Sequence, residues 1–462
     1  MKRVKDKDNV KEKDNVKVSQ KKKKNVNNKI LESKRIIKEE KNKIKIEKKN
    51  IRNKRFRNSK IGKFFRTDKD TYSFSDLFNV TLVSLAVGAF TCFCVLTIFT
   101  GGRNYFKISK DLGKFLDVYE TLNDNYYDTI DKEKLVEDAI SGMVSSVGDV
   151  YTSYADTNAT EEFNELVSGV YEGIGCTIQL QEAGLRVIEI FEDSPSEKGG
   201  LKVDDLILKV DDIEVTKETN VEELSNYIKT QAKKDITMIV SRNDEEKTLN
   251  LVRDKVETPV VSAITYEKNG KKIGYMGISL FSSVASKQFK NKLEKLENEG
   301  IDALVIDVRG NNGGYLTTVT DIASQLLPKG KKIYQIENDD KREITKDKTT
   351  THREYPIAVL VDSNSASASE ILAGAIKESY DNGFVVGTKT YGKGTVQQVK
   401  KLKDGSMIKY TVENWLTPDG NWIDKEGIEP TDLVEFDGQT YYENPIAEND
   451  NQLQKALELV SQ

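Results

Sequence analysis

The pattern of apolar and polar residues separates the chain into stretches of different periodicity. The first is an uncharged apolar run from Leu77 to Phe99. At ~1.5 Å per helical residue, this run is long enough to cross a bilayer core of ~30 Å, and it predicts a transmembrane helix over 77–99. A cleaved signal peptide is the alternative, but the basic segment before the run is long, and no small-x-small cleavage site follows Phe99.

The pattern changes twice in the next part of the chain. Apolar residues recur at helical spacing over 112–126 and 135–147, which predicts two amphipathic helices in a helical region over 100–165. Over 166–256 short alternating strands such as LRVIEIF and DITMIVSR are separated by turns such as SPSEKGGL. This second pattern predicts a small, mostly β module.

Beyond residue 257, candidates for buried strands alternate with candidates for helices. The strand candidates are KIGYMGISLF, ALVIDVRG, IAVLVD and GFVVGTK, and helical spacing lies between them at about 284–299, 316–327 and 367–379. This alternation predicts an α/β core over 257–435. Residues 449–461 predict a last helix, which we expect to be peripheral in a C-terminal tail over 436–462.

Charge is distributed unevenly along the chain. The first 70 residues carry about 28 Lys/Arg and about 10 Asp/Glu, so the formal net charge of -4 leaves about -22 on the remainder. A segment so rich in Lys and Asn cannot bury enough apolar surface to offset the entropy of ordering, and we predict a disordered basic tail over 1–76. Whether this tail is only solvated or adheres weakly to anionic lipid or nucleic acid is left open.

The charge asymmetry also predicts a topology. Because the Lys/Arg excess precedes the apolar run, the tail is expected in the cytoplasm and residues 100–462 across the membrane. We therefore expect a single-pass protein of the cell membrane whose chemistry is extracytoplasmic.

Cysteine and histidine usage narrows the classes of chemistry. Cys92 and Cys94 lie within the apolar run and Cys176 is the only other cysteine, which excludes an intramolecular disulfide or a cysteine-rich metal site in the exported part. His352 is the only histidine and lies in the polar run KDKTTTHRE. We expect neither a Ser-His-Asp triad nor a metal site built on it.

A first candidate for catalysis is Ser367, in the segment DSNSASASEILA. A buried strand ends and a helix begins there, so the hydroxyl lies near a positive helix end that favours a developing anion. The spacing Ser367-x-x-Glu370 also matches a capping box, and a simple helix cap is the alternative.

Two further motifs follow strand candidates in the same core. In YGKGTVQQ, Lys393 is flanked by glycines and followed by Gln397; burial could lower its pKa enough to make it a base, whereas an exposed turn lysine is the alternative. In DVRGNNGGYL, backbone N–H groups of the Gly-Gly turn could stabilise an oxyanion, and a plain strand-to-helix connection is the alternative.

The β module carries a candidate binding loop. Gly173, Ile174 and Gly175 open the strand CTIQL, and SPSEKGGLKVDDLILKVDDIEV follows after one further strand. Consecutive small residues let N–H groups converge on an anion, and an adjacent strand edge can accept an extended peptide. Together these segments resemble a PDZ domain of the kind found in bacterial proteases, which implies recognition of a substrate C-terminus.

The order of GG turn, SASASE and GKGTVQ resembles the carboxy-terminal processing (tail-specific) peptidase family. The resemblance covers roughly 110–435 and includes DVYTSY and LTPDGNWIDKEGIEPTDLV. It implies a crotonase-like α/β catalytic core with an inserted PDZ domain. It further implies Ser367 as nucleophile, Lys393 as general base and Gln397 as the residue that orients the lysine. The implied oxyanion donors are Gly313 or Gly314 together with Ala368.

Two departures from the family pattern are visible. The stretch KESYDNGFVVG is one residue longer than usual, and we expect a helix-to-strand loop to absorb it. DVYTSY replaces the more usual DPYSxY, which we expect to affect the helical region and not the chemistry.

The sequence therefore predicts a membrane-anchored serine endopeptidase that cleaves extracytoplasmic proteins near their C-termini and needs no cofactor. Its expected partners are proteins or peptides with apolar C-termini and the membrane, with no specific nucleic acid; homo-oligomerisation is left open. The alternatives are a non-catalytic, membrane-tethered peptide-binding scaffold and an acyl-CoA enzyme of crotonase-like fold.

Overall fold

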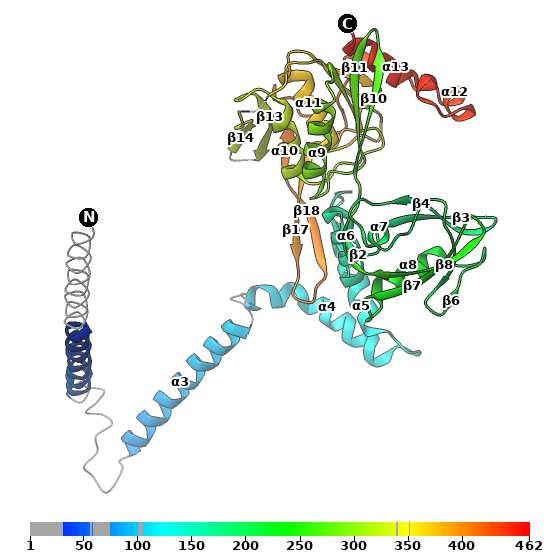
Figure 1. Cartoon of the computed structure of the whole chain (residues 1–462). Coiled ribbons are helices and arrows are strands. Elements are labelled where there is room, and N and C mark those ends of the chain that lie inside the picture. The colour runs from blue at the N-terminus through cyan, green and yellow to red at the C-terminus, as the bar shows by residue number, and fades with distance from the viewer. Residues whose placement is uncertain (1–30, 56–57, 59–73, 100–104, 339–340, 351) are drawn as a thin grey trace, which may run out of the picture. The chain divides into compact units, whose positions relative to one another are not determined.

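The computed structural model describes residues 31–55, 58, 74–99, 105–338, 341–350 and 352–462 (Figure 1). The chain forms two compact units, residues 1–125 and 126–462, which are described separately.

The first unit is helical where it is described. Helix α3 spans Phe74–Phe99, and α4 spans Tyr105–Asn125. Within α3, the 18 residues Phe78–Val95 have a mean hydropathy of 2.0, so this helix is long and apolar enough to cross a membrane. Residues 31–55 are also helical, with every side chain exposed, which differs from the disordered tail predicted over 1–76. This stretch is rich in Lys, Glu and Arg, which favour helix even without a packing partner; most of the remaining tail lies outside the described residues.

The second unit begins with two capped helices around a short strand. Helix α5 spans Lys132–Ser145, β1 spans Ser153–Ala155, and α6 spans Thr157–Ser168. Helix α6 ends at Gly169, whose φ of 68° is left-handed and whose Cβ, if present, would lie 2.6 Å from Ser282 Oγ. Glycine is therefore required where α6 gives way to the β module.

A mostly β module lies where the alternating pattern predicted one. Its sheet has the strand order β3-β4-β5-β7-β8, with β6 beside β5 and β3 at an edge. The bounds are β3 Cys176–Gln181, β4 Gly184–Ile190, α7 Pro195–Lys198, β5 Leu206–Val210, β6 Ile213–Glu214, α8 Val221–Thr230, β7 Asp235–Arg242 and β8 Glu245–Val252. Strands β2 (Val170–Gly173) and β9 (Asp254–Glu257) pair where the chain enters and leaves the module.

The α/β core is built on a six-stranded sheet of order β10-β11-β12-β15-β16-β19. Strand β10 runs antiparallel to β11, and the other neighbours are parallel. The strands are β10 Val261–Lys268, β11 Lys271–Ile278, β12 Ala303–Asp307, β15 Ile357–Val361, β16 Gly383–Gly387 and β19 Asp432–Leu433. Strands β12 and β15 are buried throughout, which explains their continuous apolar runs.

Helices cover both faces of this sheet. Helices α9 (Ala285–Asn298), α10 (Leu316–Leu326) and α11 (Ala368–Ser379) pack on one face in the main hydrophobic core. Helix α13 (Asn451–Val460) packs on the other face against alternate residues of the same strands. The prediction of a peripheral C-terminal helix was therefore wrong, because the apolar stripe of α13 covers a sheet face that would otherwise be exposed. Short elements α12 (Gly438–Glu443) and η1 (Ala447–Asn449) precede it.

A second sheet was not predicted from the sequence. Strand β18 (Met407–Leu416) pairs with β1, with β13 (Lys332–Asn338) and with β17 (Thr395–Lys401), and β14 (Lys341–Lys346) pairs with β13. Strands β17 and β18 form a long hairpin (Figure 1). Through β1, this sheet connects the segment DVYTSY to the hairpin that follows Lys393.

Candidate active site

Three neighbouring parallel strands bring the three sequence motifs to one edge of the sheet. Strand β12 leads into the Gly-Gly turn, β15 leads into Ser367, and β16 leads into Lys393. Because β12, β15 and β16 are adjacent and parallel, their carboxyl ends lie side by side. This edge is where α/β sheets place their sites.

Ser367 lies in a sharp turn between β15 and α11. Its φ is 55° and its ψ is -111°, a conformation that costs about 1–3 kcal/mol for a residue with a side chain. Helix α11 begins at the next residue, so the half-buried serine lies at a helix N-terminus. Ser367 and Glu370 also form the capping box that their spacing predicted. An ordinary cap residue has extended backbone angles, so the strain at Ser367 points to a function besides capping.

The Gly-Gly turn contacts the serine directly. A Cβ on Gly313, where φ is 107°, would lie 2.8 Å from the Ala366 carbonyl oxygen and 2.9 Å from Ser367 Cβ. Only glycine allows this approach.

Asn311 fixes the two turns against each other and was not singled out from the sequence. Its carbonyl oxygen accepts hydrogen bonds from Ala366 N at 3.0 Å and Ser369 Oγ at 2.8 Å. Its fully buried side chain accepts from Gly313 N and donates to the Ile278 carbonyl oxygen. The available signal was a run of two asparagines after a buried strand, where a polar side chain needs partners.

Two backbone N–H groups remain available at the turn. The Gly313 N–H is engaged by Asn311 at 2.8 Å, whereas the N–H groups of Gly314 and Ala368 have no hydrogen-bond partner among the described residues. The Gly313 carbonyl oxygen and the Tyr315 N–H both bond Phe281. Backbone groups alternate in direction along an extended segment, so the Gly314 N–H points away from Phe281. The Ala368 N–H belongs to the first turn of α11, which has no intrahelical acceptors.

Glu370 connects the serine turn to the lysine loop. Its fully buried carboxylate accepts the backbone N–H of Ser367 at 2.8 Å and of Lys393 at 3.0 Å. The other oxygen accepts Thr390 Oγ1 at 2.6 Å and the Gly392 N–H at 2.7 Å. Burial raises the pKa of this carboxyl, and the four hydrogen bonds act in the opposite direction.

Lys393 is half-buried, and its surroundings favour the neutral amine. Desolvation lowers its pKa below the ordinary lysine value, and the nearby Lys409 lowers it further. Its Nζ lies 4.7 Å from the ring centroid of Tyr151 and is not hydrogen-bonded to Ser367 in this structure. Tyr151 is common to DVYTSY and the more usual DPYSxY, so the expected effect of this departure on the helical region stays a prediction.

Gln397 does not bond Lys393 directly, although it was predicted to orient the lysine. Its side-chain nitrogen donates to Thr395 Oγ1 at 2.9 Å and to Thr411 Oγ1 at 3.2 Å. Thr411 in turn donates to the Asp149 carboxylate at 2.6 Å. Gln397 is thus linked through Thr411 and Asp149 to the segment that carries Tyr151.

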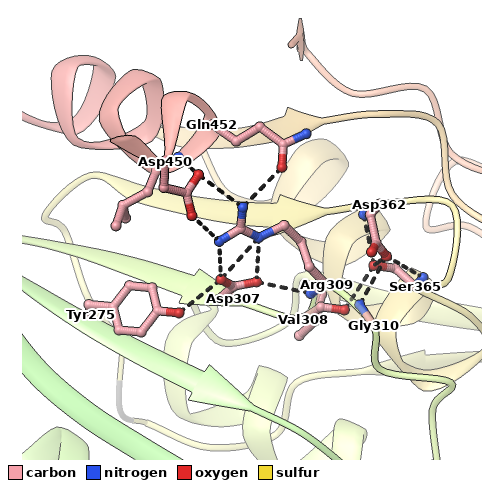
Figure 2. A network of polar contacts seen from close by, with 10 residues as sticks. Tyr275, Asp307, Val308, Arg309, Gly310, Asp362, Ser365, Asp450 and Gln452 are labelled. Carbon is pink, nitrogen blue, oxygen red and sulfur yellow. Dashed lines mark hydrogen bonds and ion pairs between the residues drawn. The ribbon is translucent and has the colours of Figure 1, made fainter. Parts of the chain in front are cut away.

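A buried ion-pair network supports the strand ends from the far side of the sheet (Figure 2). The Arg309 guanidinium bonds Asp307 at 2.6 Å and Asp450 at 2.8 Å, so it joins β12 to α13. Asp362 accepts the Gly310 N–H at 3.0 Å, and Ser365 Oγ donates to the Val308 carbonyl oxygen at 2.8 Å. The segments after β12 and β15 are thus cross-linked before they reach Gly313 and Ser367.

The predicted binding loop of the β module borders a cavity. Gly173 and Ile174 line a hollow of about 280 Å³, together with Cys176 of edge strand β3 and residues of α8. Gly175 has a φ of 75°, and a Cβ there would lie 2.5 Å from Ser194 Cβ. An apolar hollow beside a free strand edge suits an added peptide strand.

His352 is exposed and pairs with Glu354 at 3.5 Å. No group of three or more His, Cys, Asp or Glu side chains suited to a metal ion occurs in the described part of the chain.

Comparison with known proteins supports the grouping of these motifs. Residues 272–434 match the model of peptidase family S41, 98–159 match the N-terminal domain of activating protease CtpB, and 173–252 match a PDZ domain.

Relatives align over about two thirds of the chain or more. The carboxy-terminal processing protease CtpB of Bacillus subtilis is 40% identical over 332 residues, which is 70% of this chain and 67% of the relative. A probable CtpA-like serine protease of Staphylococcus aureus strain N315 is 35% identical over 69% of this chain and 64% of its own length, slightly under two thirds. Among solved structures, a photosystem II D1 C-terminal processing protease is 24% identical with a TM-score of 0.43, covering 78% of this chain and 92% of that one.

Proposed function

This chain belongs to peptidase family S41, a family of C-terminal processing serine proteases, and we propose that it cleaves extracytoplasmic proteins near their C-termini with a Ser367–Lys393 dyad. The observation that carries the assignment of the dyad is the shared Glu370 carboxylate. It accepts a backbone N–H from both residues and thereby fixes the lysine loop against the start of α11.

The first chemical step is acylation of the serine. Neutral Lys393 removes the Oγ proton of Ser367 as this oxygen attacks the scissile carbonyl carbon, and the carbonyl oxygen becomes an oxyanion. The free N–H groups of Ala368 and Gly314 are the proposed oxyanion donors, because the Gly313 N–H is already engaged by Asn311. The Lys393 ammonium then gives its proton to the leaving amine, and the C–N bond breaks.

Hydrolysis of the acyl-enzyme uses the same groups in reverse roles. Lys393 removes a proton from water as the water oxygen attacks the ester carbonyl, and it returns that proton to Ser367 Oγ as the acyl bond breaks. Because Nζ is over the Tyr151 ring in this structure, the side chain must turn toward the serine for either step.

The remaining parts of the chain supply recognition and location. The proposed PDZ ligand is the substrate C-terminus, with its carboxylate at Gly173–Gly175 and its apolar last side chain in the adjoining hollow. Helix α3 is the proposed single membrane anchor, and the Lys/Arg excess before it supports a cytoplasmic N-terminus.

The test uses the full-length chain in detergent micelles and an unfolded protein substrate with an apolar C-terminus. Wild type should cleave it, and Ser367→Ala and Lys393→Ala should each lose at least ~10³-fold in kcat/KM. Lys389→Ala is the matched control, since this exposed lysine lies on the same loop and pairs with Glu429 at the surface. Undiminished cleavage by Lys393→Ala would refute the dyad, and binding of C-terminal peptides without any cleavage by wild type would favour the scaffold.

A further inference from the structure

An aromatic ring from a distant part of the sequence lies close to the charged end of the candidate base. Tyr151 lies in the loop between α5 and β1, and its ring centroid is 4.7 Å from Lys393 Nζ. An ammonium at this distance from an aromatic face is attracted by the ring quadrupole. The ring is half-buried, so water screens this attraction only in part.

A hydrogen-bonded chain fixes the loop that carries the ring. The Asp149 carboxylate accepts Tyr151 N at 3.0 Å, Thr152 Oγ1 at 2.5 Å and Thr411 Oγ1 at 2.6 Å. Gln397 donates to the same Thr411, and β1 continues the attachment by pairing Ser153 with Lys409 of β18. The ring therefore has a defined position relative to the hairpin that follows the lysine.

The charged groups around Lys393 come from several elements. Glu370 of α11 and Asp149 of the loop before β1 favour its ammonium, whereas Lys409 of β18 disfavours it. The Tyr151 hydroxyl interacts with Tyr391, which lies two residues before the lysine, and Asp424 also faces this tyrosine. Tyr151 stays a neutral phenol, because burial and these neighbours raise its pKa.

We propose that Tyr151 is a positioning residue whose ring holds the ammonium of Lys393, the resting base, by its aromatic face. The role of Lys393 as base rests on the proposed function, but this cation–π contact does not. Glu370 fixes the backbone of the lysine, and Tyr151 fixes its charged end. The Asp149–Thr411–Gln397 chain explains how Gln397 can influence the lysine without touching it.

The test measures the proton affinity of Lys393 without relying on turnover. In full-length protein carrying Ser367→Ala, the rate at which acetic anhydride labels Lys393 is followed against pH by peptide mass spectrometry. Tyr151→Leu should lower the pKa of Lys393 by roughly half a unit to one and a half units, because the ammonium loses the ring. Tyr151→Phe keeps the ring and should keep the pKa of the parent protein.

The sign of the pKa shift of Lys393 distinguishes a ring that attracts the ammonium from a ring that only excludes water. If the ring only excludes water, Tyr151→Leu admits more water and the pKa of Lys393 rises or stays constant, which would overturn the proposal. Pentafluorophenylalanine at position 151 keeps the ring shape but reverses its quadrupole, and it should lower the pKa as leucine does. This variant also guards against misfolding of Tyr151→Leu, and Tyr442→Leu, at an exposed tyrosine of α12, is the control for the substitution itself.

The two proposals can fail separately. If the pKa of Lys393 falls in Tyr151→Leu and with the fluorinated ring, but Lys393→Ala cleaves substrate like wild type, the cation–π contact is supported and the dyad is refuted. If Lys393 is required for cleavage, but neither Tyr151→Leu nor the fluorinated ring changes its pKa, the dyad is supported and the cation–π contact is overturned.

Discussion

The backbone N–H of Lys393 donates to Oε2 of Glu370 at 3.0 Å, and the same oxygen accepts the N–H of Ser367 at 2.8 Å. One buried carboxylate therefore sets the distance between the start of α11 and the lysine loop. Since the hydrogen bonds are charge-assisted and shielded from water, the loop cannot shift without losing interactions of about 1.5–3 kcal/mol each.

Glu370→Gln should reduce both stability and activity. A glutamine side chain has one oxygen in place of two, and its NH₂ group would face N–H donors that need an acceptor. We expect the free energy of unfolding to fall by about 2–4 kcal/mol and kcat/KM to fall at least ~100-fold. Urea denaturation and peptide cleavage measure the two effects.

The control for this substitution is Glu354→Gln, at an exposed carboxylate that pairs with His352. It should leave both quantities near the wild-type values. A Glu370→Gln enzyme with wild-type kcat/KM would show that the shared carboxylate does not position the dyad.

Lys393→Met should abolish cleavage and yet stabilise the fold at neutral pH. The pKa of Lys393 is lowered in the folded state, so the unfolded chain binds more protons between the folded and unfolded pKa values. Wild-type stability therefore rises with pH through this window. At pH 7, below the unfolded pKa, the folded protein has not gained this stability. Removing the desolvated amine should add about 0.5–2 kcal/mol at pH 7.

This gain should shrink as pH rises through the window toward the unfolded lysine value of ~10.4, and it should be lost above that value, where both states hold a neutral amine. Urea unfolding of both proteins across this range measures it. A gain that is independent of pH would mean that methionine acts only through packing.

The active-site edge could be predicted because its signals are local. A continuous apolar run that ends in DVRG or DSNSAS indicates a buried strand followed by a helix. Helices α10 and α11 begin within one residue of the predicted positions. The adjacency of β12 and β15 then follows from the rules for parallel sheets.

The partners of these motifs could not be predicted because they are remote in sequence. Tyr151 reaches Lys393 through the pairing of β1 with β18 and the Asp149–Thr411 hydrogen bond, and no periodicity encodes that register. Asp450, which caps α13, and Gln452 in its first turn are polar but buried, where a sequence pattern predicts exposure. They are buried because both bond Arg309.

Gly313→Ala should displace Ser367, the proposed nucleophile. The new methyl group would overlap Ser367 Cβ and the Ala366 carbonyl oxygen, and φ at this position is 107°. A shift of about 1 Å in a reacting group can cost ~100-fold in rate, so we expect at least this loss in kcat with a smaller change in KM. Steady-state kinetics at saturating substrate measure the effect.

Gly330→Ala is the matched control, because its φ is 85° but a Cβ there meets nothing within 4 Å. It should show the cost of backbone strain alone, about 1 kcal/mol in stability, with no loss of kcat. Equal kinetic losses in both variants would mean that strain, and not the contact with Ser367, explains the Gly313 result.

The hollow beside β3 should be the site at which peptide C-termini bind, and α8 offers a paired test of this. Ser225 lines the hollow, whereas Asn226 is exposed on the next face of the same helix. Ser225→Trp should fill the hollow and weaken binding at least ~10-fold, while Asn226→Trp should not, because consecutive helical residues point in different directions.

Fluorescence polarisation of a labelled peptide with an apolar C-terminus measures the affinity, and the same peptide with an amidated C-terminus should bind poorly to wild type. Equal binding of the free and amidated peptides would exclude a carboxylate contact at Gly173–Gly175, and equal losses in both tryptophan variants would place the peptide elsewhere on the module.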